Sequence, residues 1–323
     1  MKIGLLCGRE YSFPPAFIER VNQLGASHGI TAEMVKFGGT RMDEPPGYRV
    51  IVDRISHEVE YYRGALKHAV LHGTYVVNNP FWWTADDKFF NYCVMHKLGV
   101  AIPRTVLLPQ KGYPADVDLT PESLRNLMFP LDWDGLLDYV GRPAILKPYS
   151  GGGWKHVYKV NDRDELLAAY ELTSPYPMTL QQFINFDRYV RCFTFGKSDI
   201  TPVAYDPRER RYIVDHQYLA PALGARVVRD AQTINLALGY EMNTIEFAIQ
   251  DDVPYAIDYL NPAPDFERDR ITEFYFNHVV EKMANLVIDR ALNGQPSQCW
   301  PRWEEMLGIG PASGFTGAPG GRP

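Results

Sequence analysis

The sequence predicts an α/β protein built from two or three subdomains. Three observations indicate this class. Short apolar runs alternate with stretches of helical periodicity over roughly the first quarter of the chain. Later segments read as strands with helices between them. The length of 323 residues exceeds the size at which one hydrophobic core keeps growing, so more than one core is expected.

The N-terminal part is predicted to be a parallel sheet covered by helices. Two stretches, 15–25 and 61–71, carry apolar residues at helical spacing, and glycines stand at their ends. Parallel strands need crossover connections, which are usually helices. The β-rich runs that would form this sheet are 2–7, 32–37, 49–55 and 75–78.

A third helix is predicted after these strands. Thr84 has the character of an N-cap, Asp86 and Asp87 would lie in the first turn, and Gly99 would end the helix. Its apolar stripe would consist of Phe89, Phe90, Cys93, Val94 and Leu98. Residues 109–135 hold several prolines and little periodicity, so we interpret them as an insertion or linker without an assigned role.

The rest of the chain alternates between strands and single helices. From residue 144 it reads as strand, Gly-rich loop, strand, helix (164–172) and strand. From about residue 189 it is strand-rich, with helices at 226–238 and 273–292. Residues 308–323 contain mainly Gly, Pro, Ala and Ser and are predicted to be disordered.

Composition and charge exclude several classes of protein. Hydrophobic residues make up 46% and charged residues 22%, which is typical of soluble globular proteins. A net charge of −6 argues against a non-specific nucleic-acid binder. No apolar run is long enough to span a membrane, and no secretory signal is recognisable, so a cytoplasmic protein is expected. The scattered cysteines predict reduced thiols and no zinc site: Cys7, Cys93, Cys192 and Cys299.

One lysine lies in an apolar β-run and is followed by a Gly-rich loop. Lys147 belongs to the run 144–148, and Ser150 precedes Gly151, Gly152 and Gly153. An unpaired ammonium is costly to bury, and a phosphate would be a suitable partner. Glycine N–H groups can approach phosphate oxygens closely. The spacing is not that of a P-loop. The alternative is a plain β-turn with a lysine that reaches solvent.

Two acids flank a predicted hairpin near the end of the patterned region. With a three-residue turn, Glu246 and Asp258 would share a face of the sheet, where two carboxylates and the nearby Asn261 could bind a hard cation. A four-residue loop would put the acids on opposite faces. The alternative is that both acids are simply solvated.

Polar residues in other β-runs are further candidates. Gln181 and Gln182 lie in a short run whose edge could bind an adenine, and Arg191 is a charge in an apolar strand, which typically pairs with a carboxylate or phosphate. Substrate candidates lie at the ends of N-terminal strands, where open α/β folds bind ligands. They are Arg9, Arg54 and Ser56, although an Arg at a strand end is more often a surface residue.

In this order, the motifs resemble those of the ATP-grasp superfamily. The chain is most similar to the glutathione-synthetase and ribosomal-S6-modification type carboxylate-amine ligases, over about residues 1–292. The residues that carry the resemblance are Asp87-Lys88, Val100-Ala101-Ile102-Pro103-Arg104-Thr105, Ile145-Leu146-Lys147-Pro148 with its Gly loop, Leu180-Gln181-Gln182-Phe183-Ile184, Arg191, and Ile257-Asp258-Tyr259-Leu260-Asn261-Pro262.

The resemblance implies an architecture and an activity. It implies an ATP-grasp fold: a Rossmann-like N-terminal domain (1–83), a central subdomain with a linker (84–184) and a C-terminal subdomain (185–307), with ATP held between the last two. It implies a ligase that uses Mg-ATP to convert a carboxylate into an acyl phosphate for attack by an amine. A small molecule or a peptide would supply the carboxylate, and a homodimer is compatible with the sequence. The alternatives are a phosphotransferase and a nucleotide-binding module without turnover.

The resemblance also assigns roles to individual residues. Lys88 and Lys147 would bind ATP phosphates under a flap formed by Ser150 and the three glycines that follow it. Gln181 and Gln182 would lie near the adenine, Phe183 and Ile184 would supply the hinge, and Asp187 would bind the ribose. Arg191 would stabilise the transferred phosphoryl group. Mg²⁺ would be bound by Glu246, Asp258 and Asn261.

Two positions depart from the family's pattern. The family usually has an acid two residues before the asparagine, but Tyr259 stands there and Asp258 is one residue further away. Either a bulge turns Asp258 inward, or the metal site is altered and Asp265 or Glu267 compensates. Gln182 stands where the family often has a glutamate, and its amide oxygen could still accept from the adenine amine.

Overall fold

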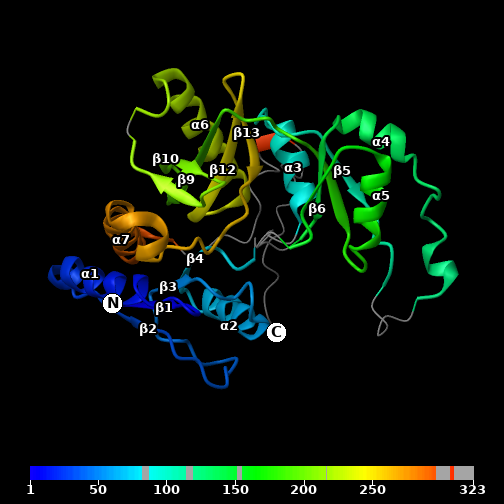
Figure 1. The fold of residues 1–323 in the computed structure, drawn as a ribbon. Helices are drawn as coiled ribbons and strands as arrows, with labels where there is room; N and C mark the ends of the chain where they lie inside the picture. The colour runs from blue at the N-terminus through cyan, green and yellow to red at the C-terminus, as the bar shows by residue number, and fades with distance from the viewer. Residues whose placement is uncertain (82–86, 114–118, 151–154, 216, 296–305, 309–323) are drawn as a thin grey trace.

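A computed structural model describes the chain except residues 82–86, 114–118, 151–154, 216, 296–305 and 309–323. It contains three sheets (Figure 1). The expectations for Thr84, Asp86, Cys299, the three loop glycines and nearly all of the predicted disordered tail therefore fall outside the described residues. The α/β class is confirmed.

The N-terminal sheet is parallel, as predicted. Its strand order is β2-β1-β3-β4. The strands are β1 (Lys2–Leu6), β2 (Thr31–Met34), β3 (Val50–Asp53) and β4 (Tyr75–Val77). The crossover helices are α1 (Phe13–Gly25), which is followed by the short η1 (Ala26–His28), and α2 (Glu60–Leu71). Candidate residues Arg9, Arg54 and Ser56 follow strands at the carboxyl edge of this sheet.

The central sheet is antiparallel and has its own hydrophobic core. Its strand order is β5-β8-β6-β7. The strands are β5 (Thr105–Leu108), β6 (Ala144–Pro148), β7 (Tyr158–Val160) and β8 (Met178–Gln182). The helices α4 (Trp133–Val140) and α5 (Arg163–Glu171) pack on it. The segment interpreted as an unpatterned linker also contains the short η2 (Pro121–Leu124) and the start of α4, because Asp132 caps that helix by accepting from the Gly135 N–H.

The third sheet is antiparallel and has five strands in the order β11-β10-β9-β12-β13. The strands are β9 (Arg188–Phe195), β10 (Asp199–Asp206), β11 (Arg211–Ile213), β12 (Met242–Gln250) and β13 (Val253–Asp258). Helix α6 (Pro221–Leu238) covers one face of this sheet. It begins five residues before the predicted start of 226, since Pro221 occupies its first turn, where a missing N–H costs nothing.

Helix α3 (Lys88–Lys97) differs from its prediction in start and in orientation. Asp87, which was expected in the first turn, is its N-cap and accepts from the Phe90 N–H. The predicted apolar stripe is correct only in part, because Val94 is buried but Phe90 is exposed and Cys93 is only half-buried. The buried side combines polar with apolar residues: Lys88, Asn91, Tyr92, Val94 and Met95.

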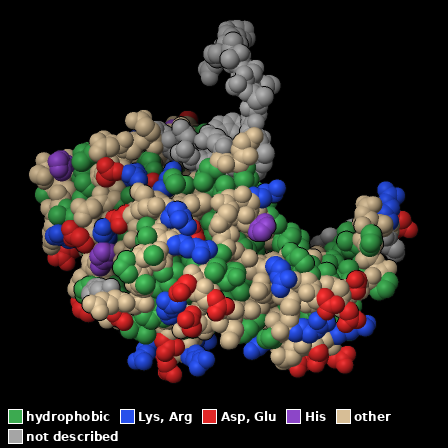
Figure 2. All heavy atoms as spheres, turned by 90° about the horizontal axis from the view of Figure 1, so that it is seen from above, with side chains coloured by type: hydrophobic (Ala, Val, Ile, Leu, Met, Phe, Trp, Pro, Cys, Tyr) green, Lys and Arg blue, Asp and Glu red, His purple; other side chains and the backbone are tan. Residues whose placement is uncertain are grey.

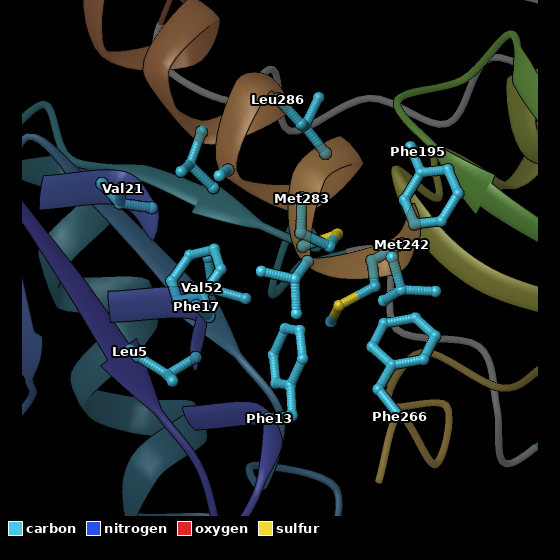
Figure 3. Close-up of a cluster of buried hydrophobic side chains, with 14 of the residues drawn as sticks. Leu5, Phe13, Phe17, Val21, Val52, Phe195, Met242, Phe266, Met283 and Leu286 are labelled. Carbon is cyan, nitrogen blue, oxygen red and sulfur yellow. The ribbon is translucent and has the colours of Figure 1, made fainter. Parts of the chain in front are cut away.

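The N-terminal sheet shares a core with helix α7 (Arg268–Asn293) and with the third sheet. Figure 3 shows Phe13 and Phe17 of α1 facing Met283 of α7 and Met242 of β12. In Figure 1, α7 lies between α1 and strand β9. The central sheet, with its separate core, lies apart from this pair.

The N-termini of α1 and α7 cap each other. The Glu267 carboxylate, just before α7, accepts from the backbone N–H groups of Tyr11 (3.1 Å) and Ser12 (2.8 Å) and from the Ser12 hydroxyl (2.5 Å). The Ser12 Oγ in turn accepts from the Arg268 N–H at 3.0 Å. The first backbone N–H groups of a helix have no partner within the helix. Here such groups find acceptors in a residue that is 255 positions away in the sequence.

The surface carries both signs of charge. On the face drawn in Figure 2, basic and acidic side chains are interspersed. Cys7, Cys93 and Cys192 are free thiols. None of the helices in the described part of the chain has the length and apolar character of a membrane span.

Candidate functional site

The candidate site lies on the face of the third sheet opposite α6. In the strand register, Arg191 of β9 pairs with Glu246 of β12, and Glu246 pairs with Asp258 of β13. Because paired residues in a sheet share a face, the three charged side chains project to the same side. The structure therefore brings together the arginine and both acids predicted from the sequence.

The two acids share a face for a different reason from the one predicted. The turn has two residues, Asp251 and Asp252, both with positive φ (53° and 57°), and not three. This turn alone would put the acids on opposite faces, since Phe247 then pairs with Ala256. The register shifts between Glu246 and Phe247, and the extra residue, Ile257, is a β-bulge that returns Asp258 to the face of Glu246. The bulge alternative was thus the correct one.

Two lysines reach this hairpin from other elements. Lys88, the first residue of α3, is buried, and its Nζ lies 3.1 Å from Asp258 Oδ2. Lys147 of β6 donates to the Tyr92 hydroxyl at 2.9 Å and to the carbonyl of the bulged Ile257 at 3.2 Å. The Tyr92 hydroxyl itself donates to the same carbonyl at 2.9 Å. The central sheet, α3 and the bulge therefore meet at one point.

Arg191 is held by an acid and by aromatic rings. Its Nη2 lies 2.6 Å from Glu246 Oε1, and its Nη1 donates to the Tyr212 hydroxyl at 3.3 Å. Its guanidinium carbon lies 3.9 Å from the centre of the Tyr205 ring. The other carboxylate oxygen of Glu246 accepts from the Tyr189 hydroxyl.

The electrostatics of the two acids differ. Burial raises the pKa of Glu246, and the Arg191 guanidinium only partly offsets this. Burial acts in the same sense on Asp258, but the ammonium groups of Lys88 and Lys147 outweigh it and hold the pKa of Asp258 below its ordinary value. Burial also lowers the pKa of Lys147, against the pull of both acids. Asp258 is therefore a carboxylate at neutral pH.

The donor set fits a hard cation of the magnesium type. Among the described residues, no three His, Cys, Asp or Glu side chains gather as a metal site. Mg²⁺, however, is commonly held by one or two carboxylates together with substrate phosphates, and two carboxylates share this face. The side chain of Asn261 is exposed just beyond β13.

A buried amide on the far face of the sheet holds the segment after β13. Asn243 is fully buried, and its Oδ1 accepts from the Asn261 N–H at 2.9 Å. Its Nδ2 donates to the Tyr259 carbonyl at 2.8 Å. Tyr259, which stands where the family pattern has an acid, is buried. Asn243 therefore fixes the backbone that carries Asn261.

The predicted adenine hinge follows β8. Gln181 is buried and donates to the Thr105 hydroxyl at 2.8 Å, while Gln182 Oε1 accepts from the Arg104 N–H at 3.2 Å. The Lys159 Nζ lies 4.2 Å from the centre of the Phe183 ring, and Ile184 is buried. Asp187 is exposed beside Arg188 (3.4 Å), and Ser150 is half-buried where the described part of the loop ends.

The predicted substrate residues have protein partners. Arg54 is buried, packs against the rings of both Phe13 and Phe266, and binds Glu10 and the Pro264 carbonyl. Ser56 is buried and donates to Asp53. Arg9 is exposed, 3.9 Å from Glu58. Arg54 thus joins the N-terminal sheet to the segment before α7.

The acids proposed as replacements for Asp258 face elsewhere. The Glu267 carboxylate caps α1, and Asp265 is exposed and accepts from the Glu267 N–H at 3.1 Å. Asp258 is accordingly the second acid of the site.

Sequence reasoning missed three contributing residues. Tyr92 lies one helical turn after Lys88, so the spacing could have placed it on the lysine's face. Tyr189 lies two residues before Arg191, and period-two alternation could have paired it with the same face. Asn243 carries no local signal, because its role depends on the chain that returns beside it.

Comparison with known proteins bears on the fold. No protein-family model and no curated protein matches the chain. Among solved structures, it resembles a RimK-domain ATP-grasp protein from Sphaerobacter thermophilus (19% identity, TM-score 0.64), covering 88% of this chain and 99% of that one. It also resembles the Bacillus anthracis D-alanine–D-alanine ligase complexed with ATP (17%, 0.62), covering 90% and 97%.

A third similar structure is the macrocyclase MdnC of Microcystis aeruginosa bound to its precursor peptide MdnA (15% identity, TM-score 0.57), covering 89% of this chain and 99% of that one. These likenesses extend over nearly the whole of each protein. The chain therefore has the ATP-grasp fold.

Proposed function

We propose that the protein is an ATP-dependent ligase that joins a carboxylate to an amine. The observation that carries this proposal is the meeting of two lysines, one arginine and two acids from separate parts of an ATP-grasp fold. Cations for phosphate and carboxylates for a metal are the groups that phosphoryl transfer from ATP requires.

Each charged residue has a role in this proposal. Lys88 and Lys147 bind the ATP phosphates, and Arg191 binds the group in transfer. Glu246, Asp258 and Asn261 hold Mg²⁺, which when bound would neutralise phosphate charge. Ser150 and Gly151, Gly152 and Gly153 cover the phosphates. The base and ribose lie against the end of β8 and the residues after it: Gln181, Gln182, Phe183, Ile184 and Asp187.

The reaction has two steps. A carboxylate oxygen of the substrate attacks the γ-phosphorus, and ADP leaves with the electron pair of the broken P–O bond. The acyl phosphate is then attacked at its carbon by a neutral amine, and inorganic phosphate leaves. Fixed cations stabilise the charge that develops in the first step without having to reorganise. Covering the phosphates keeps water from the acyl phosphate.

Both a small molecule and a peptide fit as the carboxylate or the amine. The similar structures include a D-alanine–D-alanine ligase and a macrocyclase bound to a peptide. Asp53, His57, Asn78, Pro262 and Ala263 lie together at the carboxyl edge of the N-terminal sheet, where open α/β folds bind ligands. We propose that the substrates bind on this side of the nucleotide.

An ATPase screen with pooled acids and amines tests the proposal. We expect ADP and phosphate release that requires an acid and rises with an amine. Hydroxylamine should replace the amine and give a hydroxamate, because it captures acyl phosphates. ADP release with a stable phosphorylated product and no response to amines would identify a phosphotransferase. ATP binding without turnover in any pool would favour a nucleotide-binding module.

A further inference from the structure

Three tyrosines surround the charged pair formed by Arg191 and Glu246, and the proposed roles do not use them. We call Tyr189, Tyr205 and Tyr212 the tyrosine cluster. They come from the neighbouring strands β9, β10 and β11. Arg191 pairs with Val203, two residues before Tyr205, and Tyr205 pairs with Tyr212. Because residues two apart in a strand share a face, the cluster lies on the face of the candidate site.

The cluster holds the guanidinium from two directions. The Tyr205 ring lies against its flat face, with 3.9 Å between the ring centre and the guanidinium carbon. The Tyr212 hydroxyl accepts from Nη1 at 3.3 Å. Tyr205 and Tyr212 also meet edge to face, with 4.9 Å between ring centres, so each supports the other.

The cluster also holds the acid that Arg191 pairs with. The Tyr189 hydroxyl donates to one carboxylate oxygen of Glu246, and Arg191 Nη2 lies 2.6 Å from the other. The Tyr189 and Tyr205 rings lie 5.9 Å apart, which links this contact to the stack below Arg191. Both members of the charged pair are thus held by the cluster, Arg191 by Tyr205 and Tyr212 and Glu246 by Tyr189.

A long side chain in a cleft is useful only if its donors stay aimed at the reacting group. An arginine has several rotatable bonds, and one stacked face together with two fixed nitrogens removes most of its freedom. Of its remaining N–H groups, the buried Nε has no hydrogen-bond partner within the described structure. Misplacement of such a group by about 1 Å can cost on the order of 10²-fold in rate.

We propose that the tyrosine cluster positions Arg191 for the phosphoryl group, and that Tyr205 sets the plane of its guanidinium. This inference rests on the proposed function. Tyr205 is a positioning residue, since it acts through Arg191 and needs no contact with substrate. A purely structural role predicts a loss of stability with unchanged kinetics, whereas positioning predicts a change in kcat.

Two substitutions at Tyr205 separate these roles. Tyr205→Phe keeps the aromatic face and removes only the hydroxyl, while Tyr205→Leu removes the face and keeps an apolar side chain. We expect Tyr205→Phe to retain kcat within about twofold and Tyr205→Leu to lower it roughly 10- to 100-fold, with a much smaller rise, of a few fold, in KM for ATP. Equal kcat values for the two variants and the wild type would overturn the proposal.

A double-mutant cycle with Arg191→Lys tests whether the effect passes through Arg191. An ammonium cannot reproduce a stacked planar fork. Tyr205→Leu should therefore cost much less in the Arg191→Lys background than in the wild type. An equal cost in both backgrounds would show that Tyr205 acts independently of Arg191 and would contradict the proposal.

Binding measurements keep this inference separate from the ligase proposal. Calorimetry of the full chain with Mg²⁺ compares a non-hydrolysable ATP analogue with ADP, which lacks the γ-phosphate. Tyr205→Leu should reduce the preference for the analogue at least about threefold and leave the ADP affinity unchanged, and Tyr205→Phe should match the wild type. If the wild type shows this pattern but no ligation, the ligase proposal fails and the cluster's role stands. Equal preferences in all three proteins would overturn the positioning role.

Discussion

At the scale of single residues, Asp258 connects the two halves of the candidate site. It pairs with Glu246 across the hairpin and lies 3.1 Å from the Nζ of the buried Lys88. The ammonium groups near it hold its pKa below the ordinary value, so it presents a carboxylate over the whole neutral range. A group in this setting can exchange a lysine partner for a bound cation without changing protonation.

Asp258→Asn should lower turnover and weaken the Mg²⁺ response of the enzyme. The amide has nearly the same shape but no charge, so we expect turnover to fall on the order of 10²-fold and the Mg²⁺ concentration for half-maximal activity to rise. A magnesium titration of ADP release measures both. The matched control is Asp265→Asn, which should behave as wild type. The opposite ranking of the two variants would show that Asp265 is the metal ligand.

Lys147→Met should weaken ATP binding and leave stability nearly unchanged. Loss of a charged hydrogen bond to phosphate costs about tenfold or more in affinity, measured by calorimetry, with the exposed Lys97→Met as the control. Burial lowers the pKa of Lys147, so at a pH below the folded pKa the charged ammonium reduces the stability of the folded protein. Removing that charge in Lys147→Met therefore offsets the stability lost through poorer packing. A fall in stability equal to the loss in binding energy would contradict this role.

The pH dependence of ATP affinity gives a second measurement on Lys147. Since its pKa lies below the ordinary value of 10.5, the ammonium is lost at a lower pH than that of an exposed lysine. As the pH is raised, the ATP affinity of the wild type should therefore begin to fall before pH 10.5 is reached. Lys147→Met should lack this alkaline fall. An identical alkaline profile in both proteins would assign the fall to another group.

Local sequence predicted the charged residues of the site, but not the contacts that place them. A lysine in an apolar run and acids on a hairpin are visible locally, because burial of a charge needs a partner. The face of α3 that carries Lys88, Asn91 and Tyr92 has the polar character of an exposed face. It is buried because the third sheet packs against it. The contacts of Asn243 join residues 16 and 18 positions apart through a bulge that no spacing rule foresees.

At the scale of elements, the paired N-termini of α1 and α7 are the clearest long-range device. Burial alone would raise the pKa of Glu267, but the hydrogen bonds from Ser12, Phe13 and Tyr11 outweigh it and lower this pKa below 4.5. The carboxylate also meets the positive end of the α1 dipole. One side chain therefore determines how two helices begin.

Glu267→Ala should destabilise the protein by about 2 kcal/mol at neutral pH, because several N–H groups lose their acceptor. The folded pKa lies below the unfolded value, so this contribution is fully present above about pH 4.5 and is lost as the pH falls through the folded pKa. Urea unfolding at several pH values should show the gap between wild type and variant closing at acid pH. A gap that stays constant down to pH 3 would rule out the charged cap.

At the scale of the whole molecule, one hydrophobic core joins the N-terminal sheet to α7 and the third sheet, and another belongs to the central sheet. The alternation of strands and helices was sufficient to predict the parallel N-terminal sheet. It could not predict that α1 packs on α7, because each helix shows only that it has an apolar side and not which surface covers it. The central sheet, in contrast, keeps a core made almost entirely of its own residues.

Met283→Ala should reveal this division. Met283 of α7 is fully buried between α1 and the third sheet. Its truncation should lower the free energy of unfolding by about 2–5 kcal/mol. Hydrogen exchange should accelerate in α1 and α7 together and change little in β6 and β8. The control, Leu180→Ala in the central core, should give the reverse pattern. Equal acceleration everywhere would mean that the whole chain unfolds as one unit.

The shared core has a mechanical consequence. The N-terminal sheet, α7 and the third sheet share one core and form a single base. Helix α3 packs onto that base through Tyr92 and Met95. A rotation of the central sheet relative to this base would pivot on the two chain segments that join them, one after α3 and one after β8. Lys88 would stay with the base, while Lys147 would travel with the moving part. The distance between Lys147 and Tyr92 would therefore change when the central sheet rotates. Two spectroscopic probes, one on α3 and one on β6, would measure that change.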